Sequence, residues 1–208
     1  MADWRNGGRL TRRVTLAVAL LLSAGPAVRL TAQDSLPVGY GTLKRDDILV
    51  KLDTDALQLQ VLPLSEQVIR LLAPDTYRSL AALIRSKRGA IDTLGQRGGV
   101  PHPTLVLVTF IGLVPQARFT PDDVNLTSRG RLFRPVAIVP LSPTWASYQI
   151  DARQQAIAIY LFDEGISVRE QLTVSYQGLS SDAWSRSILT LERERARVMG
   201  RAQAQSRP

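Results

Sequence analysis

Residues 105–111 read LVLVTFI, an unbroken apolar run that is rich in β-branched side chains. Such a run is typical of a strand that is buried on both faces of a sheet. It is too short to cross a bilayer, because a membrane-spanning helix needs about 20 apolar residues. The stretch therefore predicts a central strand in the core of a β-rich domain.

Shorter strand candidates follow this run and are separated by residues that favour turns. They are residues 124–126, 132–139, 148–150, 156–162 and 168–176. Short strands at spacings of about 8–12 residues are typical of a sandwich or a barrel. Because the connections are too short for parallel crossovers, the pairing should be antiparallel. Pro135 and Pro140 favour an edge strand or a strand terminus, since proline cannot donate a ladder hydrogen bond.

The residues before the central run predict a hairpin followed by helix. Residues 48–52 and 57–62 read as two strands, the second with the alternating pattern of a half-buried strand. Helical periodicity starts after Ser65 and resumes after Pro74-Asp75. Cations and a glycine at residues 86–89 are typical of a helix C-terminus. The glycine- and proline-rich residues 90–103 then read as a loop and as a candidate seam in the domain.

The chain closes with a predicted helix. Ser180 or Ser181, followed by Asp182, is typical of a helix N-terminus, and Gly200 should end the helix. Together the elements predict an α+β fold. It consists of one antiparallel β-sandwich-like domain over residues 48–200, with a small N-terminal helical insertion and a C-terminal helix. We expect residues 33–47 to form a flexible leader and residues 201–208 to form a disordered tail.

The N-terminal residues have the organisation of a secretory signal peptide over residues 1–32. Four arginines and one aspartate precede an apolar run at residues 14–28. This run is too short for a stable span, and Pro26 would break a helix. The sequence predicts cleavage near Ala32 and a periplasmic or extracellular protein without a stable membrane span. An uncleaved anchor is the alternative, and Arg12-Arg13 leaves both Sec and twin-arginine export open.

Composition excludes several classes of function. The formal charge of +8 falls to +4 once residues 1–32, with five basic residues and one acidic residue, are removed. The remaining positive charge is spread along the chain, so we expect no nucleic-acid binding. Cysteine is absent, which rules out disulfides and thiol chemistry. The lone His102 and the scattered acidic pairs fit loops and turns, so we expect no metal and no cofactor.

Residues 129–145 have the most distinctive composition, because arginines flank an aromatic residue and a tryptophan follows in a proline-bounded loop. Arginine and tryptophan are typical anchors of interfaces. The candidate ligand- or partner-binding residues are therefore Arg131, Phe133, Arg134 and Trp145. In the alternative interpretation, which the size of the aromatic rings favours, Phe133 and Trp145 fill the sandwich core and the arginines face solvent.

The chain lacks the sequence motifs of nucleophilic or nucleotide-dependent catalysis. We therefore expect an exported, non-enzymatic binding or structural module that acts through a protein or a cell-envelope polymer. One alternative is a carboxylate-type hydrolase of cell-wall or polysaccharide substrates, which requires two carboxylates that converge in a cleft. Another is an anion-binding module built on Arg131 and Arg134, whose binding would depend on salt.

Overall fold

The apolar run at residues 105–111 lies within β3 (Thr104–Gly112), the middle strand of the larger sheet. The computed structural model describes residues 36–205, so the expected signal peptide and residues 206–208 lie outside the described residues. The larger sheet has the order β1-β2-β3-β9-β7, and each neighbouring pair is antiparallel. Its other strands are β1 (Val50–Asp53), β2 (Leu57–Pro63), β9 (Gln155–Phe162) and β7 (Pro135–Pro140).

The smaller sheet has the order β11-β10-β5-β6 and is also antiparallel. Its strands are β11 (Leu179–Ser181), β10 (Leu172–Tyr176), β5 (Asn125–Ser128) and β6 (Arg131–Phe133), and a separate short ladder joins β4 (Ala117–Arg118) to β8 (Gln149–Ile150). The rings of Phe110 in β3 and Tyr176 in β10 have centroids 5.5 Å apart, so the two sheets share a core. The fold is α+β with an antiparallel β-sandwich-like body, which confirms the predicted class.

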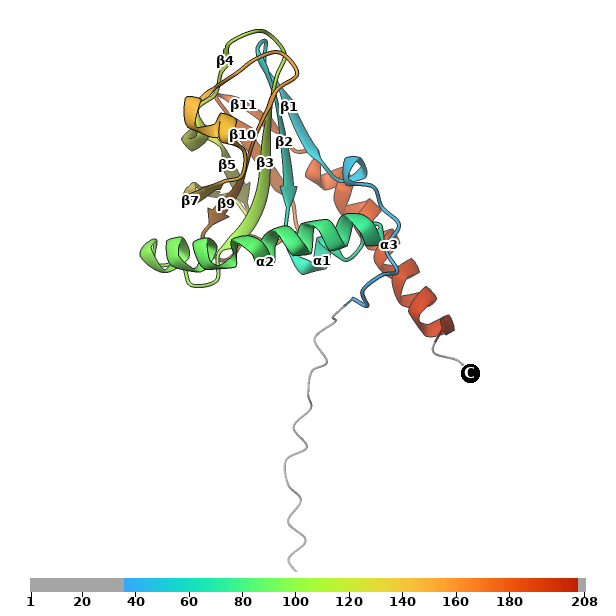
Figure 1. The fold of residues 1–208 in the computed structure, drawn as a ribbon. Helices are drawn as coiled ribbons and strands as arrows, with labels where there is room; N and C mark the ends of the chain where they lie inside the picture. The colour runs from blue at the N-terminus through green and yellow to red at the C-terminus, as the bar shows by residue number, and fades with distance from the viewer. Residues whose placement is uncertain (1–35, 206–208) are drawn as a thin grey trace, which may run out of the picture. The chain divides into compact units, whose positions relative to one another are not determined.

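The helices lie outside the two sheets. They are α1 (Glu66–Ile69), α2 (Pro74–Arg97) and α3 (Trp184–Gln205), with short 3-10 turns at η1 (Arg45–Asp47), η2 (Pro121–Asp123) and η3 (Pro143–Ser147). Figure 1 shows α2 running crosswise to β2 and β3, and α3 at the C-terminal end of the chain. Among residues 36–205, none of the helices has the length and apolar character that crossing a membrane requires.

Helix α2 extends beyond the end that the sequence predicts. We expected a loop from residue 90, but α2 continues to Arg97 and buries Ile91 and Gly95. Gly89 is exposed in the helix, where glycine costs only about 1 kcal/mol relative to alanine. The helix ends at Gly98, where an added Cβ atom would lie 2.1 Å from a methyl group of Val136. Glycine at this position therefore allows the end of α2 to approach β7.

The described part of the expected flexible leader packs onto the domain. Leu36 and Leu43 are buried in the main apolar cluster, and Leu43 forms a bridge with Leu72. The Arg70 guanidinium donates a hydrogen bond of 2.8 Å to the Leu36 carbonyl. Burial of Leu36 and Leu43 removes apolar surface from water and so favours packing of this segment on the domain. Two leucines without a regular spacing were too weak a pattern to predict this packing.

Helix α3 likewise continues through Gly200 to Gln205, so the expected tail is helical where the structure describes it. Arg201, one residue past the predicted end, donates hydrogen bonds to the Glu194 carboxylate and to the Tyr40 carbonyl. Glu194 is 1% exposed and needs a cationic partner, since an unpaired buried charge is costly. This pairing stabilises the last turns of α3.

The single strand predicted over residues 132–139 is in fact two strands in different sheets. β6 is an edge strand of the smaller sheet and β7 is an edge strand of the larger sheet, which confirms the edge position expected from the prolines. Arg134 lies between them, where the chain crosses from one sheet to the other. Proline at position 135 has no N–H and so cannot continue the β6 ladder. This crossing places β7 beside η2.

Candidate functional site

The side of the sandwich where β6 passes into β7 carries two neighbouring hollows, which we call the β7 groove. The aromatic hollow has a volume of about 520 Å³ and is lined by Phe119, Thr120, Pro121, Asp122, Ile138, Pro140, Trp145 and Tyr148. The acidic hollow has a volume of about 420 Å³ and is lined by Asp122, Asp123, Asn125, Arg134 and Pro135. Asp122 lines both hollows, so they are adjacent and share a wall.

Aromatic rings form the bed of the aromatic hollow. Trp145 is 5% exposed and makes an edge-on contact with Tyr160, with ring centroids 6.0 Å apart. Phe119 lies 5.3 Å from Trp145 and 6.0 Å from Tyr148 by ring centroids. These contacts join the inner surface of the groove to the close-packed sandwich core.

Tyr148 is the exposed member of this aromatic group. Its side chain is 53% exposed, and its backbone has the left-handed conformation with φ 50 and ψ 22. That conformation is unfavourable for a bulky side chain. The Tyr148 carbonyl accepts a hydrogen bond of 3.0 Å from the Phe119 N–H, which helps hold the residue in place. The fold thus keeps a solvent-facing ring at the groove mouth in spite of a conformational cost.

Two buried tyrosine hydroxyls form hydrogen bonds with the backbone at the start of η2. The Tyr160 hydroxyl donates a hydrogen bond of 3.0 Å to the Pro121 carbonyl. The Tyr176 hydroxyl accepts a hydrogen bond of 3.1 Å from the Thr120 N–H. Burial raises the pKa of both tyrosines, and the Asp122 carboxylate raises the pKa of Tyr160 further. The bond from the Thr120 N–H acts in the opposite direction on Tyr176 but leaves its pKa raised, so both hydroxyls stay protonated. These bonds fix the turn that presents Asp122.

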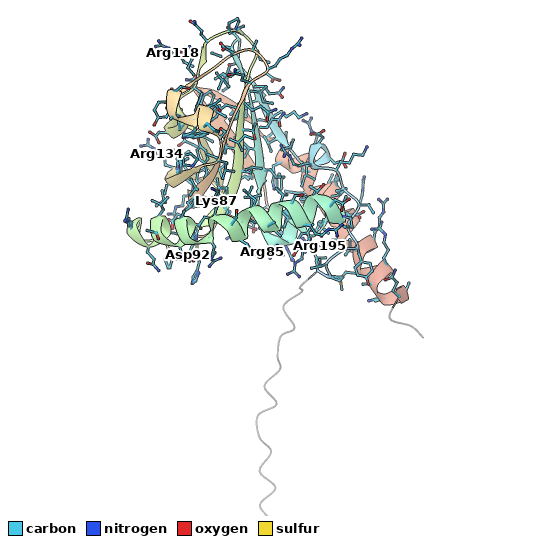
Figure 2. All side chains as sticks on the ribbon, in the orientation of Figure 1. Arg85, Lys87, Asp92, Arg118, Arg134 and Arg195 are labelled. Carbon is cyan, nitrogen blue, oxygen red and sulfur yellow. The ribbon has the colours of Figure 1, made fainter. Side chains whose placement is uncertain are left out.

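The structure brings together two of the four residues that the sequence singled out. Trp145 lines the aromatic hollow and Arg134 lines the acidic hollow. Figure 2 shows Arg134 on the side of the sandwich opposite α3. Phe133 and Trp145 are buried and the arginines are exposed, as the core interpretation predicts. Arg134 nevertheless contributes to a recognisable concave surface.

Arg131 and Phe133 form a separate pair on β6. The Arg131 guanidinium lies 4.7 Å from the centre of the Phe133 ring and makes a salt bridge of 2.8 Å with Asp163. These partners occupy part of the guanidinium, and the Arg131 side chain remains 65% exposed. Arg134 lines the acidic hollow and Arg131 lines neither hollow, so the two arginines do not share one hollow of the groove.

Asp122, Asn125 and Tyr148 are not among the binding residues that the sequence predicts. Asp122 reads as a turn residue in its Pro-Asp-Asp context, and Tyr148 reads as the start of a strand. Their place in a groove depends on contacts distant in sequence, such as the bond between Tyr160 and Pro121, which are 39 residues apart. The one local signal was Trp145 in its proline-bounded loop, which is only three residues before Tyr148.

The carboxylates of the groove lie on one wall. A glycoside hydrolase needs two carboxyl groups on either side of the substrate, about 5–10 Å apart. Asp122 and Asp123 are adjacent residues of η2, and the lining contributed by β7 carries no carboxylate. Residues 36–205 also contain no group of three or more His, Cys, Asp or Glu side chains placed to hold a metal ion. Among the residues that line the two hollows, carboxylates therefore come from η2 alone.

Comparisons with models of protein families, with curated proteins and with solved structures give no match to this chain.

Proposed function

We propose that this protein is an exported, non-enzymatic binding module that holds a protein or a cell-envelope polymer in the β7 groove. The observation that carries the proposal is Tyr148, which is exposed at the groove mouth in a left-handed backbone conformation. Strained backbone persists where the surrounding structure enforces it, and such positions cluster at ligand-binding sites. Aromatic side chains also supply much of the affinity at interfaces.

The rigidity of the groove supports the same function. η2 rests on the hydroxyls of Tyr160 and Tyr176, and the bed of the aromatic hollow belongs to the core. A preformed site loses little conformational entropy when a ligand binds, so more of the contact energy appears as affinity. A groove held in this way is suited to an extended ligand that crosses both hollows.

The proposal can be tested by photo-crosslinking in the native envelope. A benzophenone amino acid in place of Tyr148 should capture a discrete partner, because this residue lines the aromatic hollow and is exposed to solvent. The control replaces Leu189, which is 61% exposed on α3, with the same amino acid and should capture no such species. Recovery of the monomer alone from both variants would count against a groove-bound partner.

Export is tested separately by the N-terminus of the mature chain. Cleavage near Ala32 predicts a protein that begins at Gln33 and is found in the periplasm or the medium. Mass spectrometry of the purified native protein measures this directly. An intact Met1, or a majority of molecules in the cytoplasm, would contradict the exported part of the proposal.

A further inference from the structure

β7 presents an open edge beside the groove. Among the described strands it pairs only with β9, and it ends the order of the larger sheet. The Leu141 N–H bonds to the Ile157 carbonyl at 2.8 Å, which sets the phase of the ladder. Because bonded and non-bonded pairs alternate in antiparallel strands, Val139 faces β9 while the N–H and C=O of Ile138 point away from it. Ile138 also lines the aromatic hollow.

The composition of β7 leaves this edge able to accept another strand. Natural edge strands are commonly protected by charged side chains, which repel a second strand. Residues 135–140 carry no charge and read PVAIVP. The two prolines lack N–H groups, the ladder with β9 has a bulge between Pro135 and Ala137, and the end of α2 packs against Val136, so an added strand is limited to the stretch around Ile138. An added strand can therefore pair with the centre of β7 but not with its ends.

The two hollows provide places for side chains of different kinds. The aromatic hollow offers Trp145, Tyr148 and Pro140, which suit an aliphatic or aromatic side chain. The acidic hollow offers the carboxylates of Asp122 and Asp123 against the single guanidinium of Arg134, so its lining has an excess of negative charge that suits a cation.

Asn125 adds an independent observation in the acidic hollow. Its Nδ2 donates to the Asp123 carbonyl at 3.0 Å, but its buried Oδ1 has no hydrogen-bond partner among the described residues. A buried acceptor without a partner is costly, and Oδ1 would gain one if the amide turns toward the hollow when an N–H donor binds there. Guanidinium and ammonium groups supply such donors together with the positive charge that the two carboxylates attract.

Building on the proposed function, we propose that the partner is a protein segment that adds as a strand to the β7 edge. Its backbone pairs with Ile138, its apolar side chain enters the aromatic hollow, and a lysine or arginine enters the acidic hollow. Strand addition of this kind takes affinity from main-chain hydrogen bonds and specificity from pockets for alternate side chains. Cation and apolar residue should lie an even number of positions apart, because such residues share one face of a strand.

The test begins with a phage-displayed library of random nine-residue peptides selected on the mature protein. Enrichment of peptides with lysine or arginine two or four positions from an aliphatic or aromatic residue supports the proposal. Selection of acidic peptides, or of no common pattern, overturns it. The double variant Asp122→Asn and Asp123→Asn should lose the preference for cations, whereas Asp75→Asn, on α2 and outside the groove, should retain it.

A second measurement examines the backbone pairing. An enriched peptide is synthesised with N-methyl groups on its alternate central amides, which blocks donation to β7 and leaves the side chains unchanged. Binding at least tenfold weaker than that of the unmodified peptide supports strand addition, and equal binding overturns it. A neutral N-acetylglucosamine hexamer is tested in parallel. If only this oligosaccharide binds, and Tyr148→Ala abolishes its binding, strand addition is wrong while the groove remains a binding site.

Discussion

Acidic side chains occupy two contrasting regions of the molecule, the junction of α3 with the leader and the wall of the β7 groove. Glu194 in α3 is 1% exposed and accepts hydrogen bonds from the Thr42 N–H at 3.0 Å, the Thr42 hydroxyl at 2.8 Å and Arg201 at 2.8 Å. Asp122 in η2 is exposed and faces two hollows. One carboxylate has partners within the fold, and the other is presented to solvent.

The contrast separates what stability requires from what binding requires. Burying a charge is costly unless it is paired, so the fold needs the close partners of Glu194, which are Thr42 and Arg201. Burial alone would raise the pKa of Glu194, but hydrogen bonds from Arg201 and Thr42 outweigh it and hold the pKa below its usual value. Asp122 carries no such structural role, so its position is free to serve a ligand.

Loss of the cation at the junction should have the largest effect. Arg201→Ala leaves the Glu194 carboxylate buried with Thr42 and a more distant arginine, and should lower the free energy of unfolding by about 3 kcal/mol. Urea denaturation followed by tryptophan fluorescence measures the change. The matched control is Arg197→Ala, since Arg197 is 66% exposed and 3.7 Å from Glu194, and it should cost less than about 1 kcal/mol. Equal losses in both variants would refute a special role for Arg201.

The pH dependence of stability should reveal the same junction with a smaller effect. Because the pKa of Glu194 is lower in the folded state than in the unfolded state, ionised Glu194 stabilises the fold above the unfolded pKa of about 4.3. This contribution is lost as the pH falls through the folded pKa. Glu194→Gln should be about 2 kcal/mol less stable than the parent at pH 7. The difference should shrink toward pH 3 in denaturation curves, and a constant difference would contradict the account.

The next largest loss of stability should come from removing the hydrogen bond between Tyr160 and η2. Tyr160→Phe removes the donor to the Pro121 carbonyl and leaves a buried acceptor without a partner, at a cost of about 1–2 kcal/mol. Faster amide hydrogen exchange at residues 120–124 should accompany the loss, because η2 is no longer held from below. Denaturation and exchange by mass spectrometry measure both effects. Unchanged exchange in η2 would show that other contacts position the turn.

The elements that the sequence predicted best are those whose burial follows a local repeat. The apolar run of β3, the hairpin of β1 and β2, and the alternation of Leu172, Val174 and Tyr176 in β10 all have the predicted form. Prediction failed where a distant contact overrides a local signal. The sequence predicts helix ends at Gly89 and Gly200. The burial of Ile91 continues the first helix, and the pairing of Arg201 with Glu194 continues the second.

The groove was predictable only in part, for a related reason. Trp145 and Arg134 have distinctive residue types and were singled out, whereas Asp122 and Tyr148 have ordinary local contexts. Their meeting depends on the crossing from β6 to β7 and on the bond between Tyr160 and Pro121. No pattern within a short window encodes such contacts, because they are set by the register of β7 on β9.

The smallest effect on stability should come from substitutions of the groove residues themselves. Such variants can therefore show whether a residue matters for binding without mattering for folding. Tyr148→Asn removes a ring contact with Phe119 but places asparagine, which tolerates the left-handed conformation, at φ 50. These opposing changes should leave the free energy of unfolding within about 0.5 kcal/mol of the parent, and Asp122→Asn should do the same because its side chain is exposed.

Partner capture should respond in the opposite way. With a crosslinker at Ile138 as a common reporter, both groove variants should lose capture, whereas Arg201→Ala should retain it under conditions where that variant is folded. If the groove serves binding, the order of the variants by loss of capture should be the reverse of their order by loss of stability. Arg201 should then matter most for stability and least for partner binding. If the groove variants lose stability and capture in parallel, the aromatic hollow belongs to the core and the partner binds elsewhere.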